Sequence, residues 1–214
     1  MTSLQSIADG PESAPATIVL AHGAGAPMDT PFMDFFAQGL AARGWRVLRF
    51  EFDYMAARRR DGRKRPPDRQ EQLFASWRAA VRGIPPERLV VGGKSLGGRM
   101  ASMLAAELGA RACLCLGYPF HPAGKPERLR IAHLQAISVP TLIAQGSRDS
   151  LGTREEVAGY PLGRRVALHW AEDGNHDLAP RKASGRSREQ NWEEALAALD
   201  GFLREILSPA SSAK

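Results

Sequence analysis

Residues 89–100 constrain the fold of this chain more than any other stretch. They read Leu-Val-Val-Gly-Gly-Lys-Ser-Leu-Gly-Gly-Arg-Met, an apolar run of strand length that meets a Gly-x-Ser-x-Gly pattern at residues 93–97. The residues that follow, 100–108, are rich in Ala, Met and Leu, which favours a helix. A strand, a sharp turn and a helix form the context in which such a pattern presents its serine, here Ser95, as a nucleophile.

The glycines of this segment agree with so sharp a turn. A serine projected from a tight turn has strained backbone dihedrals and close neighbours, so the positions beside it must lack bulk. Gly93 and Gly97 meet this need, and Gly98 allows the following helix to pack closely. The motif alone leaves another interpretation open, a Gly-rich loop that binds phosphate or nothing.

Strand-like and helix-like stretches alternate along the rest of the chain. Apolar runs predict further strands at residues 17–21, 45–52, 112–116, 140–145 and 165–170. Helices are expected from Pro31 to about Gly44, and at residues 70–81, 153–158 and 192–207. This alternation predicts an α/β fold, an open and mainly parallel sheet with helices on both faces. Ligands of such sheets bind beyond the carboxyl ends of the strands.

The length of 214 residues suits one domain. We expect that domain at residues 16–208, after a loose leader at 1–15 and before a tail at 209–214. The sequence has no apolar run of membrane-spanning length, and its start lacks the basic and apolar regions of a signal peptide. Cys113 and Cys115 are too close along a strand to form a disulfide bond, which predicts reduced core residues in a cytoplasmic protein.

The net charge of +6 comes almost entirely from residues 58–69, which hold seven basic and two acidic side chains. A patch that binds nucleic acid and a solvated basic loop would both have this charge. The segment has no interleaved aromatic residues and no recognisable nucleic-acid-binding motif, which favours the solvated loop. We therefore expect no nucleic acid and no membrane among the partners.

Polar residues follow three of the expected strands at the points where those strands end. Ser95 follows the strand of the Gly-x-Ser-x-Gly motif, Asp149 follows the next-to-last strand, and His176 follows the last one. The order Ser, Asp, His is the one found in α/β-hydrolases. His22 to Gly25 follow the strand at 17–21, where a second backbone N–H for an oxyanion would be needed.

The sequence resembles the α/β-hydrolase superfamily in its small, nearly lidless, dienelactone-hydrolase-like form. Residues 92–99, 118–122 and 140–149 are similar to the branch of hydrolase-like proteins that contains testis-expressed proteins and an NSL-complex subunit. The resemblance covers residues 17–207. It implies an α/β-hydrolase fold with a candidate serine-hydrolase site, and part of that branch serves in protein complexes rather than in catalysis.

Carried over to this chain, the resemblance implies a Ser-His-Asp mechanism. Ser95 attacks an ester-like carbonyl to form an acyl-enzyme, His176 transfers the proton, and Asp149 orients the imidazole. The N–H groups of Leu96 and Ala24 hold the oxyanion. No metal or organic cofactor is needed. We expect five further residues to line the substrate site: Gly25, Tyr54, Lys94, Phe120 and His121.

Several residues compete for these roles. His22 is expected to brace the oxyanion loop, His133 to lie on the surface, and His169 to pack within a strand. Asp53 also stands at a strand end and is the main rival of Asp149. Lys94 is expected to form a structural ion pair, with a minor alternative in which it serves as the base for Ser95.

The function expected from these residues is a serine hydrolase that acts on small carboxylic esters or thioesters. The short connection between residues 116 and 140 argues against a lid. Arg58–Arg60 could overhang the site and favour an anionic substrate. The alternative is a catalytically silent, hydrolase-like module that binds a protein partner, and a homodimer formed through an edge strand also stays open.

Overall fold

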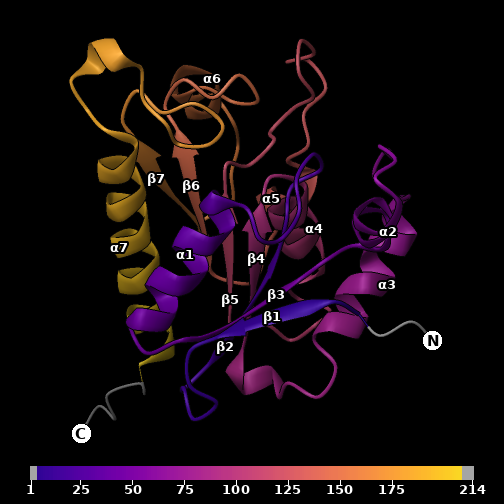
Figure 1. The fold of residues 1–214 in the computed structure, drawn as a ribbon. Helices are drawn as coiled ribbons and strands as arrows, with labels where there is room; N and C mark the ends of the chain where they lie inside the picture. Colours follow the sequence, from indigo (N-terminus) through magenta and orange to yellow (C-terminus); the bar gives the residue numbers. More distant parts are fainter. Residues whose placement is uncertain (1–3, 209–214) are drawn as a thin grey trace, which may run out of the picture.

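A seven-stranded sheet runs through the middle of the molecule in the computed structural model, which describes residues 4–208 (Figure 1). The strand order is β1-β3-β2-β4-β5-β6-β7, and all neighbours are parallel except β1 and β3. The predicted open, mainly parallel sheet is therefore confirmed. The strands are β1 (Ser6–Asp9), β2 (Thr17–Ala21), β3 (Arg46–Phe50), β4 (Leu89–Lys94), β5 (Ala112–Leu116), β6 (Thr141–Gly146) and β7 (Val166–Ala171).

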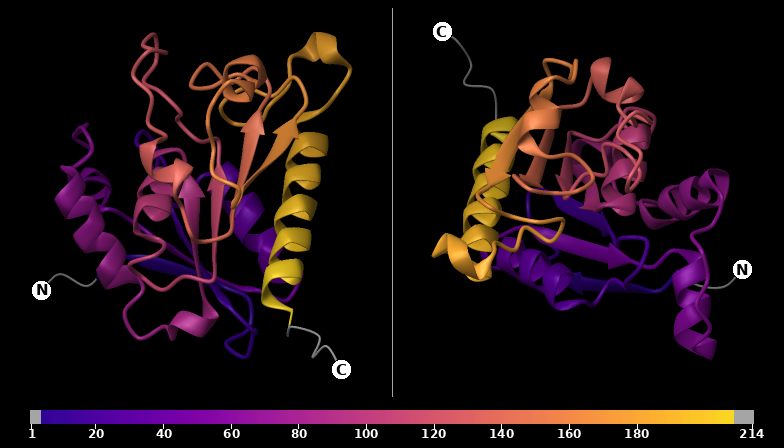
Figure 2. Two further views of the ribbon diagram at one scale, coloured as in Figure 1. Left: turned by 180° about the vertical axis from the view of Figure 1, so that it is seen from behind. Right: turned by 90° about the horizontal axis from the view of Figure 1, so that it is seen from above.

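Helices cover both faces of this sheet (Figures 1 and 2). They are α1 (Pro31–Ala42), α2 (Asp53–Asp61), α3 (Gln70–Ala80), α4 (Leu96–Leu104), α5 (Ala132–Gln135), α6 (Arg154–Ala158) and α7 (Arg188–Leu207), with short 3₁₀ turns η1 (Pro86–Arg88) and η2 (Lys182–Ser184). Helices α1 and α7 pack on one face, and α3 and α4 pack on the other. The connection from β5 to β6 contains only the short α5, so no lid domain is inserted there.

The alternation of side chains along the central strands divides the core into two halves. Val19 and Val91 face α3 and α4, whereas Ile18 and Val90 face α1 and α7. All four side chains are fully buried. Strands that are apolar on both faces belong in the middle of a parallel sheet, and this is why the apolar runs of the sequence predict the strands well.

The start of the chain differs from the expected loose leader. Ser6–Asp9 forms β1, which pairs antiparallel with β3 at the edge of the sheet. Its side chains alternate between exposed and half-buried, so the segment has too little apolar character for the sequence to indicate a strand. Arg49 on β3, almost fully buried, binds Asp9 at 2.9 Å. The expected tail at residues 209–214 lies outside the described residues.

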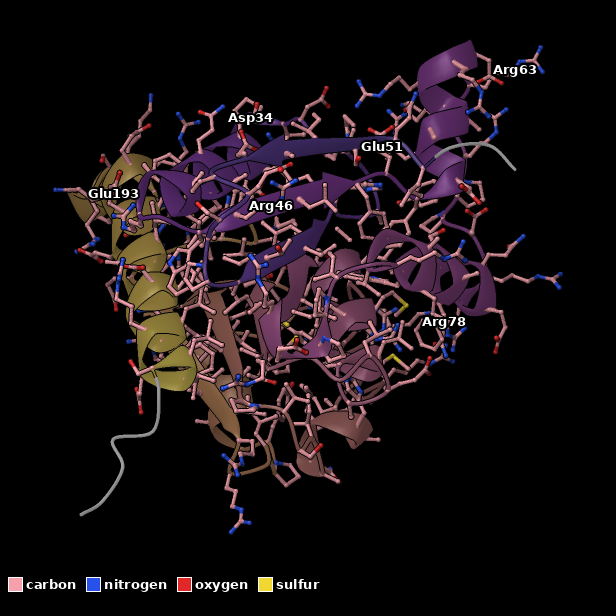
Figure 3. All side chains as sticks on the ribbon, turned by 90° about the horizontal axis from the view of Figure 1, so that it is seen from below. Asp34, Arg46, Glu51, Arg63, Arg78 and Glu193 are labelled. Atoms are coloured by element: carbon pink, nitrogen blue, oxygen red, sulfur yellow. The ribbon has the colours of Figure 1, made fainter. Side chains whose placement is uncertain are left out.

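The basic segment after β3 is half helical rather than a loop. Helix α2 occupies residues 53–61 and ends at Gly62, whose φ of 71° makes the left-handed turn at the C-terminus. Arg58, Arg59 and Arg60 lie in its last turn, where cations interact favourably with the helix dipole. Figure 3 shows Arg63 beyond the helix, pointing away from the body of the molecule.

Within residues 4–208, none of the helices combines the length and the apolar character required to cross a membrane.

Candidate active site

Ser95 stands at the turn between β4, the central strand of the sheet, and α4. Its φ of 50° and ψ of −112° lie in a region that non-glycine residues rarely occupy, which is the strain expected of a serine projected from a sharp turn. A Cβ at Gly93 or at Gly97 would come within 2.2 Å of the Ala21 carbonyl oxygen. The turn therefore requires glycine at both positions, as the motif indicated.

The structure brings Ser95, His176 and Asp149 together from the ends of three different strands. His176 Nε2 lies 2.9 Å from Ser95 Oγ, and His176 Nδ1 lies 2.7 Å from Asp149 Oδ2. With its hydrogen on Nδ1, the imidazole donates to Asp149 and accepts from Ser95. Asp149 is fully buried, whereas the His176 side chain is 29% exposed and can receive a proton from the serine and pass it on.

Gln145 is a residue of this site that sequence reasoning missed. Its Nε2 donates to Asp149 Oδ2 at 2.9 Å, and the Leu151 N–H donates to Asp149 Oδ1 at 2.9 Å. The Gln145 side chain is fully buried at the end of β6, and its Oε1 accepts from the Tyr118 N–H. The sequence does contain a signal for Gln145, which is a single amide inside an apolar strand. A buried polar side chain requires hydrogen-bond partners, so such a residue indicates a polar contact.

Two backbone N–H groups beside Ser95 are free to donate to a ligand. Leu96 is the first residue of α4, where N–H groups have no partner within the helix. A Cβ on Gly23 would lie 3.6 Å from Ser95 Cβ, so the peptide that joins Gly23 to Ala24 lies against the serine. Among the described residues, neither the Leu96 nor the Ala24 N–H has a hydrogen-bond acceptor.

Lys94 forms the structural ion pair expected of it. Its ammonium group lies 3.2 Å from Asp177 Oδ1, donates to the His176 carbonyl oxygen, and sits 5.0 Å from the centre of the Phe32 ring. Burial lowers the pKa of Lys94, and the nearby Asp177 carboxylate opposes that shift. These contacts direct the ammonium group toward the loop after β7, which carries His176. Lys94 therefore holds that loop in place.

A cavity of about 600 Å³ opens beside Ser95 and His176. Gly25 and Lys94 line it as expected. Its apolar wall includes Pro27, Pro31, Phe32, Met33, Ala179 and Trp192. The contribution of Trp192 could not be foreseen, since it depends on α7 packing beside α1, which the views of Figures 1 and 2 show.

Three residues expected in the wall of this cavity lie elsewhere. The Tyr54 hydroxyl donates to backbone carbonyls of the loop after β2. Phe120 is fully buried and packs against Tyr160, with ring centres 5.7 Å apart. His121 is 2% exposed, and its Nε2 lies 3.6 Å from Glu156. None of the three is among the described residues that line this cavity. Phe120 and His121 are buried in the connection after β5, and Tyr54 on α2 is turned toward the loop after β2.

The family assignment follows from comparison with known proteins. The family model described as an alpha/beta hydrolase domain matches residues 14–204. The chain belongs to the alpha/beta hydrolase family. The short strings that resembled the testis-expressed-protein and NSL-complex branch are not tested by this match.

Several solved structures share the fold at low sequence identity. A serine hydrolase without a lid from Xanthomonas campestris is 20% identical, with a TM-score of 0.72, over 97% of this chain and 91% of that one. Est1E from Butyrivibrio proteoclasticus is 13% identical, with a TM-score of 0.72, over 96% and 95%. Dienelactone hydrolase from Anabaena variabilis is 19% identical, with a TM-score of 0.69, over 95% and 92%.

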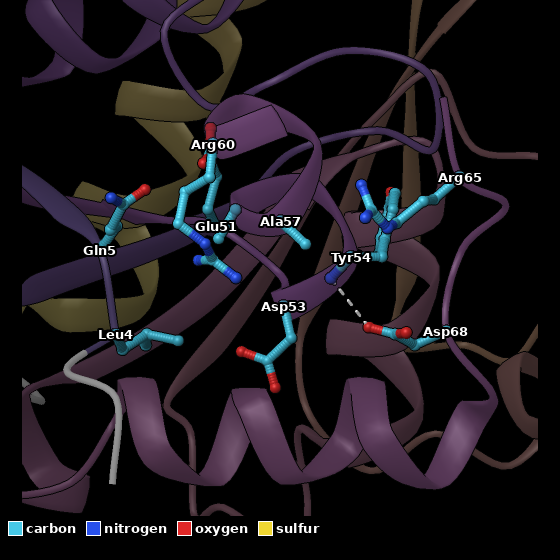
Figure 4. Close-up of a pocket in the computed structure, with 10 residues that line it drawn as sticks. Leu4, Gln5, Glu51, Asp53, Tyr54, Ala57, Arg60, Arg65 and Asp68 are labelled. Atoms are coloured by element: carbon cyan, nitrogen blue, oxygen red, sulfur yellow. Dashed lines mark hydrogen bonds between the residues drawn. The ribbon is translucent and has the colours of Figure 1, made fainter. Parts of the chain in front are cut away.

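The rivals of the triad residues occupy other positions in this hydrolase. His22 Nε2 accepts from the Phe52 N–H at 3.1 Å and Nδ1 contacts the Gly23 carbonyl at 2.7 Å, so His22 braces the loop as expected. His169 is half-buried in β7. Asp53 lines a second cavity, of about 630 Å³, together with Tyr54 (Figure 4).

The basic residues expected to overhang the site form contacts within the protein. Arg58 donates to the Gly25 carbonyl, Arg59 binds Glu51 and Asp29, and Arg60 lines the second cavity. None of the three is among the described residues that line the cavity beside Ser95. Arg58 nevertheless reaches the edge of this cavity, because Gly25 is one of its lining residues, and the selection of an anionic substrate stays a prediction.

His133, expected on the surface, is half-buried and lies 2.9 Å from Ser102 Oγ. Burial, together with the positive charge of Arg99, lowers its pKa from 6.5 to about 4. Between these two pH values, His133 of the unfolded chain binds a proton that His133 of the folded chain does not bind. The free energy of unfolding therefore decreases as the pH falls through this interval. We expect urea denaturation to show a free energy of unfolding that declines from about pH 7 to about pH 4.5.

Replacing His133 by Gln removes this titration and flattens the decline. His22 and His169 also have a lowered pKa because of burial, so part of the decline persists in the variant. A His133→Gln variant with the same pH slope as the wild-type protein would contradict the assignment.

Proposed function

We propose that this chain is a serine hydrolase that cleaves small carboxylic esters or thioesters through an acyl-enzyme. The observation that carries the proposal is the continuous set of hydrogen bonds from Ser95 through His176 to the buried Asp149, at 2.9 and 2.7 Å. It has the geometry of a nucleophile, a base and an orienting acid. The strained turn that holds Ser95 and the family membership support the same assignment.

The reaction would proceed in two halves. Ser95 Oγ attacks the carbonyl carbon while His176 Nε2 takes the serine proton, and the resulting oxyanion accepts hydrogen bonds from the Leu96 and Ala24 N–H groups. His176 then gives its proton to the leaving alcohol or thiol, and the acyl-enzyme remains. Water, deprotonated by His176, attacks the acyl carbon; the bond to Ser95 Oγ then breaks, His176 returns the proton to that oxygen, and the acid is released. Asp149 stabilises the imidazolium in both halves.

The cavity supports a small substrate. Its volume of about 600 Å³ and its wall of Phe32, Met33 and Trp192 suit an apolar acyl or alcohol group of modest size. Lys94, being paired with Asp177, adds little free charge to this wall. The short β5–β6 connection provides no lid for a long chain, which favours small esters over long-chain lipids.

We further propose that the protein works in the cytoplasm and falls in the testis-expressed-protein and NSL-complex branch. Support for the location comes from the free, buried Cys113 and Cys115, which the reducing conditions of the cytoplasm would preserve. Support for the branch comes from the strings at residues 92–99, 118–122 and 140–149. Part of that branch serves in protein complexes, which keeps a silent protein-binding module as the alternative function.

Labelling with a fluorophosphonate probe tests the proposed function. We expect the folded protein to form one covalent adduct, and peptide mapping by mass spectrometry to place it on Ser95. Ser102 provides an internal control, because its Oγ also lies 2.9 Å from a histidine Nε2 but Ser102 is not among the described residues that line the cavity beside Ser95. Folded protein that forms no adduct on Ser95 would contradict the proposal and favour the protein-binding alternative.

A further inference from the structure

The loop that joins β2 to α1, residues 22–30, is held from one side by Tyr54 of α2. The Tyr54 hydroxyl lies 3.3 Å from the Gly23 carbonyl oxygen and 3.1 Å from the Ala24 carbonyl oxygen. A hydroxyl has a single hydrogen, so the two carbonyls share one donor. Only 3% of Tyr54 is exposed, so water has little access with which to compete for its hydrogen bonds.

Two other side chains bind carbonyls of the same loop. His22 Nδ1 lies 2.7 Å from the Gly23 carbonyl oxygen, and Arg58 Nη1 donates to the Gly25 carbonyl oxygen at 3.0 Å. Three successive carbonyl groups, of residues 23, 24 and 25, therefore accept hydrogen bonds from side chains. Tyr54 and Arg58 lie one turn apart on α2, so one helix face supplies most of these donors.

These bonds determine where the N–H groups of the loop point. In a planar trans peptide, the carbonyl of one residue and the N–H of the next point in opposite directions. A hydrogen bond that holds the Gly23 carbonyl toward Tyr54 therefore turns the Ala24 N–H away from Tyr54. The loop lies between Tyr54 on one side and Ser95 on the other, since Gly23 is placed against the serine. The Ala24 N–H is thus aimed at the cavity beside Ser95.

We propose that Tyr54 is a positioning residue of this hydrolase, whose hydroxyl fixes the peptide plane that presents the Ala24 N–H to the oxyanion. This inference rests on the proposed function. Tyr54 does not touch the substrate and acts through the loop backbone. The gain is preorganisation: an N–H that is already oriented stabilises developing charge without reorganising during the reaction.

The surroundings of Tyr54 keep its hydroxyl in one place and protonated. The Tyr54 N–H donates to Asp68 Oδ2 at 3.0 Å, as Figure 4 shows, and its ring stacks on Phe52 with an interplanar angle of 15°. Burial, aided by the negative charge of Asp68, raises the pKa of Tyr54 far above its usual range. The hydroxyl therefore remains a donor at every pH at which an esterase would be assayed.

The loop is also fastened at its far end. Arg59 of α2 binds both Asp29 of the loop and the fully buried Glu51, and Glu51 in turn accepts from the Met28 N–H. The loop is therefore attached to α2 and to the end of β3 at both of its ends. Removing the single Tyr54 hydroxyl should loosen the peptides that follow Gly23 and Ala24, while His22 and Arg59 keep the loop attached.

Replacing Tyr54 by Phe tests the inference with a small ester such as 4-nitrophenyl butyrate. We expect kcat to fall about tenfold to a hundredfold while KM changes less than about twofold, because the N–H contributes in the transition state and not to substrate binding. The rate of fluorophosphonate labelling should fall by a similar factor, since the probe's phosphoryl oxygen uses the same donors. Tyr160→Phe, which removes a hydroxyl remote from this loop, is the matched control and should keep the wild-type kcat.

The outcomes separate this inference from the proposed function. A wild-type protein that neither labels nor hydrolyses esters overturns the proposed function itself. If the wild-type protein is active and the Tyr54→Phe variant keeps kcat within about twofold of the wild-type value, or shows a raised KM instead of a reduced kcat, only the inference is overturned. If Tyr54→Phe unfolds, 3-fluorotyrosine incorporated at position 54 serves in its place, because it changes the donor strength of the hydroxyl and keeps the ring: a changed kcat with unchanged KM supports the inference, and a wild-type kcat overturns it.

Discussion

Replacing Ser95 by Ala is expected to reduce the turnover of a small ester by a factor on the order of 10⁶. The serine is the proposed nucleophile, and without its Oγ no acyl-enzyme forms, so that only the oxyanion donors and substrate binding remain. Stability should change little, because alanine keeps the Cβ at this strained turn and the lost hydroxyl borders a cavity. Steady-state kinetics and a thermal melt measure both effects.

Ser102→Ala is the matched control for this substitution. Ser102 also contacts a histidine, His133, but lies on the α4 face that packs against the protein core. The control is expected to keep the wild-type kcat and KM. A Ser95→Ala variant that retains more than about a hundredth of the wild-type rate would show that another group performs the attack.

Replacing Asp149 by Asn is expected to reduce kcat by a factor on the order of 10⁴. Three donors converge on the Asp149 carboxylate: His176 Nδ1, Gln145 Nε2 and the Leu151 N–H. An amide has only one oxygen to accept them. If that oxygen faces the Leu151 N–H, the amide NH₂ group faces His176 and forces the hydrogen of the imidazole onto Nε2. His176 can then no longer accept the proton of Ser95.

The loss should appear in kcat and not in KM, because Asp149 is fully buried and does not line the cavity. Asp53→Asn is the matched control: Asp53 also follows a strand of the sheet, but it lines the second cavity. Its variant should keep the wild-type kcat within a few-fold. The reverse result, a large loss in Asp53→Asn and a small one in Asp149→Asn, would reassign the orienting acid.

Much of the fold was predictable because the chain repeats one local rule. Strands that are buried on both faces must be apolar throughout, and the helices between them carry an apolar stripe, so both are visible as periods in the sequence. The strand that sequence reasoning missed, β1, is an edge strand with alternating exposure. Helix α2 was missed because its last turns are basic, so no apolar stripe marks it.

The residues of the candidate site divide in the same way. Ser95, Asp149 and His176 were predictable because each follows a strand, and parallel strands end at one edge of the sheet. Tyr54, Phe120 and His121 also follow strands, yet they lie outside the cavity wall. Position along a strand determines the edge at which a residue emerges, but the path of the next loop determines where its side chain points.

The sequence by itself therefore determined the fold class, the strained serine turn and the order of the three polar residues, because these depend on local spacing and on the periodicity of apolar residues. Only the tertiary structure decided that Gln145 holds Asp149, that Trp192 walls the cavity and that Tyr54 binds the loop beside Ser95. Each of these contacts joins side chains to partners that other elements supply. Hydrogen bonds of that kind depend on directions and distances in space, and a linear pattern of residue types does not specify them.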